Sequence, residues 1–87
     1  MARQIDYYHL EVLAFLGGET NPVHFGRIMQ LNPRGLESAS DLVVRGMVDR
    51  SPRPDMTQHG REEDWYSLND RGKVFLNLVL DYASQNL

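Results

Sequence analysis

The sequence predicts a small α+β domain that is mostly helical, and three observations support this fold class. Three apolar stripes recur at helical spacing between Asp6 and Gly46. Two short extended segments then flank a stretch rich in proline and charge. A last helical stripe runs from Asn69 to about Ser84. We therefore expect one domain over residues 1–87, with three helices, a two-stranded hairpin and a C-terminal helix.

The first helix is predicted to begin after Asp6, whose carboxylate can cap it. Gly17 and Gly18 end it, because paired glycines favour helix termination. Its apolar side chains form two offset sets, Tyr8, Val12 and Phe15 beside Leu10, Leu13 and Leu16.

The second and third helices are short and separated by a tight turn, so residues 21–46 predict a helix-turn-helix. Asn21 is the expected cap of the second helix, with Pro22 at the first helical position and the end near Leu31. Its expected apolar face holds Val23, Phe25, Ile28 and Met29. Asn32 and Pro33 repeat the cap-proline pattern for the third helix, which Gly46 ends. Its expected buried face holds Leu36, Ala39, Leu42 and Val43.

A β-hairpin is predicted over residues 47–68. Met47–Ser51 and Asp64–Leu68 have the composition of short strands, while Pro52–Glu63 is expected to be a solvent-exposed loop. Of the adjacent Trp65 and Tyr66, alternation sends one into the core, which favours packing over base stacking. Asn69 then caps the final helix.

These residues carry a resemblance to a known class of regulators. Val44-Arg45-Gly46-Met47-Val48-Asp49-Arg50 and Trp65-Tyr66-Ser67-Leu68-Asn69-Asp70-Arg71-Gly72 are similar to the wing region of MarR-like and PadR-like winged helix-turn-helix transcription regulators. Their pattern reads R/A-G-L-V-x-R, a wing, then Y-x-L-T-x-x-G. Asn69 stands where that pattern has threonine, and the wing lacks the D-x-R found in many MarR-like proteins. The order of elements extends the similarity over nearly the whole chain.

The resemblance implies a sequence-specific regulator of double-stranded DNA, acting as a repressor, with the third helix in the major groove and the hairpin on the backbone. On that helix the polar side chains expected to face outward include Glu37, Ser40 and three candidates for base contacts, Arg34, Ser38 and Asp41. A solvated Arg34 is the alternative. The two acids either accept from cytosine amino groups or indicate that this helix does not enter a groove.

Candidate phosphate contacts are Asn32, Arg45, Arg50, Arg53, His59 and Arg61. The formal net charge is −3, which is unusual for a DNA-binding domain. The charges are nevertheless sorted, because residues 34–61 hold five arginines and four acids, whereas residues 62–87 hold two basic residues and five acids. The alternative is that these arginines pair with neighbouring acids on a solvated hairpin.

The final helix carries more apolar residues than one core stripe requires, which predicts a homodimer. Side chains expected to face the domain are Phe75, Leu78, Val79 and Tyr82. Those expected at the dimer interface are Val74, Leu76, Leu80, Ala83 and Leu87. Coverage by the first helix alone is the alternative.

Catalysis finds no support in the sequence. His9, His24 and His59 lie in separate segments without metal-ligand spacing, and there is no cysteine and no glycine-rich phosphate loop. We therefore expect no enzyme activity, no metal and no cofactor. The absence of cysteine and of a long apolar run predicts a cytoplasmic protein that does not enter a membrane. The alternative function is an acidic winged-helix module, of a phage or mobile-element type, that binds a host protein.

Overall fold

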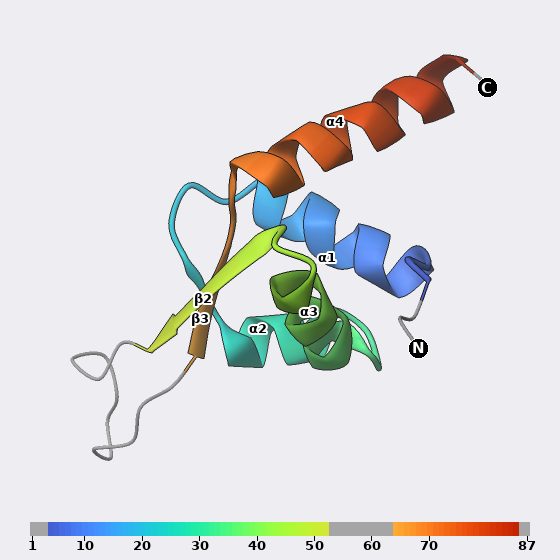
Figure 1. Cartoon of the computed structure of the whole chain (residues 1–87). Coiled ribbons are helices and arrows are strands. Elements are labelled where there is room, and N and C mark those ends of the chain that lie inside the picture. The colour runs from blue at the N-terminus through green and yellow to red at the C-terminus, as the bar shows by residue number, and fades with distance from the viewer. Residues whose placement is uncertain (1–3, 53–63, 86–87) are drawn as a thin grey trace.

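The computed structural model describes residues 4–52 and 64–85 of the chain. Within them, four helices surround one side of a small sheet (Figure 1). The elements in chain order are α1 (Tyr7–Gly17), β1 (Val23–His24), α2 (Phe25–Leu31), α3 (Gly35–Val44), β2 (Val48–Pro52), β3 (Asp64–Leu68) and α4 (Asp70–Gln85). The predicted fold class, α+β and mostly helical, is confirmed, with one strand more than expected.

The first helix begins and ends where the sequence predicts. Asp6 is the N-cap of α1, and its carboxylate accepts a hydrogen bond from the backbone N–H of His9. The backbone N of Asp6 lies 3.1 Å from Nδ1 of His9, so the two residues have the geometry of a capping box. Gly18 is the C-cap.

The predicted start of the second helix at Pro22 is wrong. Val23 and His24 instead form β1, which pairs antiparallel with β3 through Val23 opposite Tyr66 and His24 opposite Trp65. The pairing with β3 gives the backbone N–H and C=O groups of this segment hydrogen-bond partners. Val23 is β-branched and buried, which favours an extended conformation. α2 therefore starts at Phe25, and the His24 side chain accepts from the backbone N–H of Gly26. Met29, expected on the apolar face, is exposed.

The third helix starts two residues later than predicted but ends as expected. The Asn32 side chain accepts from the backbone N–H of Arg34, and the Asn32 carbonyl accepts from that of Gly35, so a turn precedes α3. After Val44 the chain reaches Gly46, whose φ of 79° lies in the left-handed region that favours glycine. The N–H of Met47 then donates to the carbonyl of Leu42 at 3.0 Å, which closes the helix as a Schellman motif.

The hairpin strands β2 and β3 are antiparallel, and the sheet order is β1-β3-β2. β3 has the predicted bounds, and β2 is shifted by one residue from Met47–Ser51 to Val48–Pro52. The predicted loop lies outside the described residues except for Pro52. Tyr66 is buried against the helices, as the alternation along this strand predicted.

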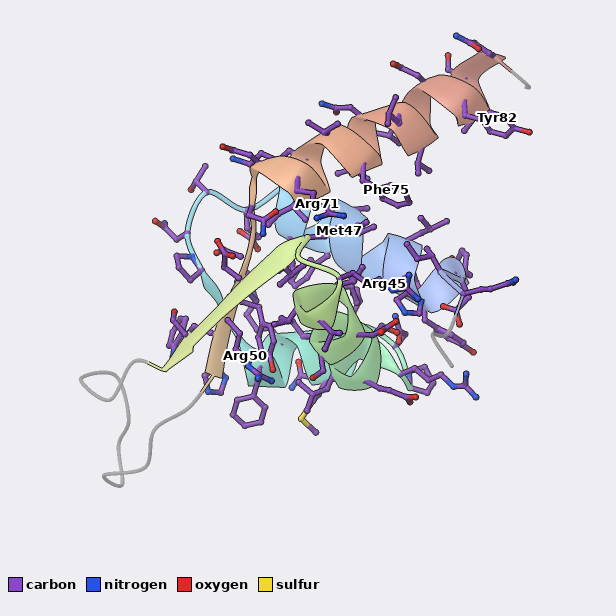
Figure 2. All side chains as sticks on the ribbon, in the orientation of Figure 1. Arg45, Met47, Arg50, Arg71, Phe75 and Tyr82 are labelled. Atoms are coloured by element: carbon purple, nitrogen blue, oxygen red, sulfur yellow. The ribbon has the colours of Figure 1, made fainter. Side chains whose placement is uncertain are left out.

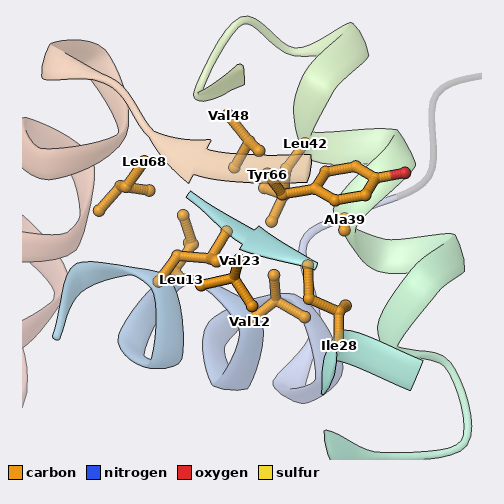
Figure 3. Packing of buried hydrophobic residues seen from close by; sticks show 10 residues of the cluster. Val12, Leu13, Val23, Ile28, Ala39, Leu42, Val48, Tyr66 and Leu68 are labelled. Carbon is orange, nitrogen blue, oxygen red and sulfur yellow. The ribbon is translucent and has the colours of Figure 1, made fainter. Parts of the chain in front are cut away.

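The core lies between the helices and one face of the sheet. Figure 3 shows the side chains of α1, α2 and α3 meeting those of the three strands. Its members are Val12, Leu13, Leu16, Val23, Ile28, Ala39, Leu42, Val48, Tyr66 and Leu68. β1 thus closes the core at the point where a helix was expected.

The C-terminal helix α4 is capped as predicted, since the Asn69 side chain accepts from the backbone N–H of Gly72 at 2.9 Å. Phe75 and Leu76 pack against the core. Leu78 and Tyr82, which were expected to face the domain, are exposed. The C-terminal half of α4 extends past the other helices, with Tyr82 near its end (Figures 1 and 2).

Candidate functional site

The exposed surface of α3 is the candidate recognition surface. Gly35, Ser38, Ala39 and Leu42 are its buried residues, so the helix presents its other side to solvent. Glu37, Ser40 and Val44 follow one another at spacings of three and four residues and share that side. We call these three residues the outward face of α3. Val44 is 85% exposed, and the face holds one carboxylate.

Arg34, the first predicted base contact, is exposed and stands at the N-cap position of α3. Its guanidinium carbon lies 5.7 Å from the centre of the Tyr8 ring of α1, a cation–π arrangement. Asn32 in the preceding turn donates to Glu11 of α1 at 3.2 Å. The N-terminal end of α3 is therefore attached to α1, with an exposed cation at that end.

Ser38, the second predicted base contact, does not face solvent. It is 1% exposed and lies on the buried side of α3 beside Ala39. The expected exposure of Ser38 was wrong because α2 packs closely on α3 at Gly35, where a Cβ would collide with the Ile28 carbonyl, so the buried side runs through residues 35, 38, 39 and 42. A hydroxyl in that position cannot reach a base edge without unpacking the helix.

Asp41, the third predicted base contact, is turned toward α1. One of its carboxylate oxygens, Oδ2, lies 2.7 Å from Nε2 of His9 and accepts from Nε of Arg45 at 3.1 Å. The other ring nitrogen of His9, Nδ1, lies 2.8 Å from Oδ1 of Asp6. The His9 side chain is fully buried. We call Asp6, His9, Asp41 and Arg45 the His9 network.

Both carboxyl groups of the His9 network have lowered pKa values. The hydrogen bond with the His9 side chain is the main reason that the pKa of Asp6 lies below its ordinary 3.8. Burial raises the pKa of Asp41, but hydrogen bonds from His9 and Arg45 together lower it by more, so that it also falls below 3.8. The ionised form of both carboxyl groups is thus favoured in the folded protein.

The contact between α1 and α3 in this network could not be predicted from the sequence, because His9 and Asp41 are 32 residues apart. His9 shares neither a short spacing nor a motif with Asp41. The one local signal was the Asp6-to-His9 spacing, which matches the Ncap and N3 positions of a capping box. The arrangement of α1 across α3 supplies the rest.

The predicted phosphate contacts lie on different elements and differ in exposure. Arg50 is exposed on β2 (Figure 2). Arg45 is half-buried and donates to Asp41, and its buried Nη2 atom has no hydrogen-bond partner among the described residues. Asn32 is half-buried in the turn before α3. Arg53, His59 and Arg61 lie outside the described residues.

The side chains of α4 divide differently from the prediction. Val74 and Leu80 are exposed as expected, together with Ala83, but Leu76 packs against the core and Leu87 lies outside the described residues. Exposed fractions are 60% for Val74, 61% for Leu78 and 70% for Tyr82. These three residues are four apart and form one stripe, which we call the α4 stripe.

Among the described residues, no three or more His, Cys, Asp or Glu side chains are grouped so that they could hold a metal ion. Nor does any described helix combine the length and the apolar character needed to cross a membrane.

The arrangement of helices and hairpin has a counterpart among solved structures. A PadR-like transcription factor from Bacteroides fragilis superimposes with a TM-score of 0.64, over 90% of this chain and 82% of that one, at 16% sequence identity. No protein-family model and no curated protein matches the sequence. The predicted resemblance to winged-helix regulators is confirmed as a resemblance of fold: the chain has the winged-helix architecture of this PadR-like structure.

Proposed function

We propose that this protein is a DNA-binding transcription regulator that places α3 in the major groove and the β2–β3 hairpin on the adjacent backbone. The observation that carries the proposal is the position of α3. It packs on α1 and α2 through its small and apolar side, leaves its other side exposed and precedes the hairpin directly. A helix held this way fits the major groove, which is wide enough for one α-helix. The PadR-like neighbour supports this function by analogy of fold.

Arg34 is the residue we propose to read a base. It is exposed at the N-terminal end of α3, and arginine forms a bidentate contact with guanine. Its stacking on Tyr8 would hold the guanidinium in a defined direction before binding. Ser38 is buried and Asp41 is held by His9 and Arg45, so neither is proposed to contact a base.

Arg50 is the described residue best placed to contact phosphate from the hairpin, because it is exposed on β2. Asn32 in the turn before α3 is a further candidate, and Arg53, His59 and Arg61 extend the proposed contacts into the loop. Arg45 is the weakest candidate, since its Nε is already bonded to Asp41. Binding through phosphates releases counterions and therefore weakens as salt rises.

The test is fluorescence anisotropy with short duplexes at low and near-physiological salt. Arg34→Ala should lower affinity by about 1–3 kcal/mol and relax preference at one base pair. Arg50→Ala should weaken binding to all duplexes and reduce the salt slope by about 1. Lys73→Ala removes an exposed charge from α4 and serves as the control that leaves binding unchanged. Absence of binding by the wild type at low salt would overturn the proposal.

We further propose that the regulator is a homodimer and represses by occupying its operator. The α4 stripe is the basis for this proposal, because three large exposed side chains on one helix face are stabilised by burial against a second copy. A two-fold dimer sets the distance between two recognition helices and so matches a palindromic site.

One observation favours a second candidate function, a module that binds a host protein. The outward face of α3 consists of the Glu37 carboxylate, the Ser40 hydroxyl and the exposed Val44. Such a face suits a protein surface better than a row of phosphates. Glu37→Gln separates the two candidate functions. A DNA-binding regulator should bind duplex DNA equally well or more tightly as Glu37→Gln, because the variant lacks a negative charge on the outward face. A protein binder would show no duplex binding at any salt concentration.

A further inference from the structure

The His9 network joins two helices that the proposed function uses differently. His9 lies on α1, and its Nε2 is 2.7 Å from a carboxylate oxygen of Asp41 on α3. The ring is completely buried, so its polar atoms depend on partners within the protein. Asp6 at the N-cap of α1 holds the opposite ring nitrogen. Asp6, at the N-terminus of the same helix, thus orients the imidazole so that its Nε2 faces α3.

Asp41 is held from two sides. Its Oδ2 accepts from Arg45, four residues along α3, and lies against His9 of α1. The carboxylate is therefore directed along the α1 side of α3 and away from the outward face. This arrangement leaves Asp41 poorly placed to meet a base edge, in contrast to its predicted role.

α3 is attached to α1 at two separate places. At the N-terminal end, Asn32 donates to Glu11 and the Arg34 guanidinium lies over Tyr8. In the C-terminal half, the attachment is the contact between His9 and Asp41. Ala39 and Leu42 also pack α3 into the core, and the two polar attachments constrain its tilt at two further points along the helix.

We propose that His9 is a positioning residue for DNA binding: through Asp41 it sets the tilt of α3 on α1 and so the direction in which Arg34 meets the groove. The inference rests on the proposed function. It predicts that loss of the contact lowers affinity for the preferred site while non-specific, phosphate-driven binding persists, because substitution of the buried His9 leaves the exposed arginines in place and Asp41→Ala removes only a negative charge.

A matched pair of variants separates the two ring nitrogens. In His9→Gln the side-chain amide nitrogen takes the approximate place of Nε2 and can still donate to Asp41. In His9→Asn the shorter amide reaches only the region of Nδ1 and cannot. Asp41→Ala removes the same contact from a partly exposed residue, and provides a second variant if His9→Asn fails to fold. Circular dichroism at the assay temperature establishes which variants are folded.

The first measurement is fluorescence anisotropy with two duplexes, the tightest-binding one selected from a random pool and an unrelated one. The second is the NMR chemical shifts of the backbone amides of α3. We expect His9→Asn and Asp41→Ala each to lower site-specific affinity by roughly 3- to 30-fold, with the double variant no worse than either alone. His9→Gln should stay near the wild type. The α3 amides should shift in the first two variants and not in His9→Gln.

Three results would decide against the proposal or its premise. If His9→Asn and His9→Gln bind the selected duplex equally, His9 stabilises the fold without positioning α3. If Asp41→Ala changes base preference and His9→Asn does not, Asp41 contacts a base after all. If the wild type binds no duplex, the proposed function fails, and the α3 amide shifts still determine whether His9 sets the tilt of α3.

Discussion

At the scale of single residues, the two carboxylates beside His9 link the fold to pH. The folded pKa values of Asp6 and Asp41 lie below the ordinary 3.8. A carboxyl group with a lowered folded pKa stabilises the protein at pH values above its unfolded pKa. That stabilisation is lost as the pH falls through the folded pKa, because the native state must then give up its ionised, hydrogen-bonded form. Acid should therefore weaken the attachment of α3 to α1.

We expect the free energy of unfolding to fall as the pH drops below about 4, and Asp41→Asn to show a smaller fall over the same range. Urea denaturation at a series of pH values from about 6 to about 2.5 measures both curves. Asp81→Asn, which removes a carboxylate from the exposed part of α4, is the matched control. Identical curves for the wild type and Asp41→Asn would show that the Asp41 contacts do not contribute to acid sensitivity.

At the scale of helices and strands, the elements with local signals were predicted well. Asp6, Gly46 and Asn69 each determine a helix end by a contact within a few residues, so the sequence identifies them. β1 was missed for the opposite reason. Its partner β3 lies more than 40 residues along the chain, and Pro22 with Asn21 is an equally good helix start in isolation. Long-range pairing decided between two locally acceptable conformations.

The same limit applies to the candidate site. Arg34 was predicted as exposed and is exposed, because residues near a helix start need no tertiary information. Ser38 and Asp41 were misplaced because α2 packs against α3 at Gly35 and because His9 of α1 lies against Asp41. The side of a short helix that faces the core depends on what packs against it, which periodicity over ten residues specifies only approximately.

The orientation of α3 can be tested without DNA. Leu42 is fully buried, so Leu42→Ala should lower the free energy of unfolding by about 2–5 kcal/mol through lost burial and a residual cavity. Val44→Ala, two residues on, removes an exposed side chain from the same helix and should change stability by less than about 0.5 kcal/mol. Urea denaturation measures both. Similar losses in the two variants would contradict the assigned outward face.

At the scale of the whole molecule, the proposed function requires an acidic protein to present a surface that DNA can approach. The net charge of −3 opposes approach to DNA, and the acids concentrate in residues 62–87. Much of that segment forms α4, on the far side of α1 from α2 in Figure 1. Of these acids, Asp70 and Asp81 lie on α4, so a dimer built on α4 would keep these two near the two-fold axis and leave the α3 surfaces of both copies available.

The α4 stripe provides the test of that assembly. By light scattering after size exclusion, we expect the wild type to have twice the chain mass of 10.0 kDa. The double variant Val74→Ser/Leu78→Ser should have the mass of one chain, because two exposed apolar side chains no longer favour burial. Met29→Ser makes the same kind of change at an exposed position of α2 and should remain dimeric. Since dimerisation follows mass action, each protein is measured over a series of concentrations. A wild type that stays monomeric at the highest concentration would contradict the proposed dimer. A double variant that stays dimeric would show that the α4 stripe is not the interface. In either case the α4 stripe would give no support to binding at a palindromic operator.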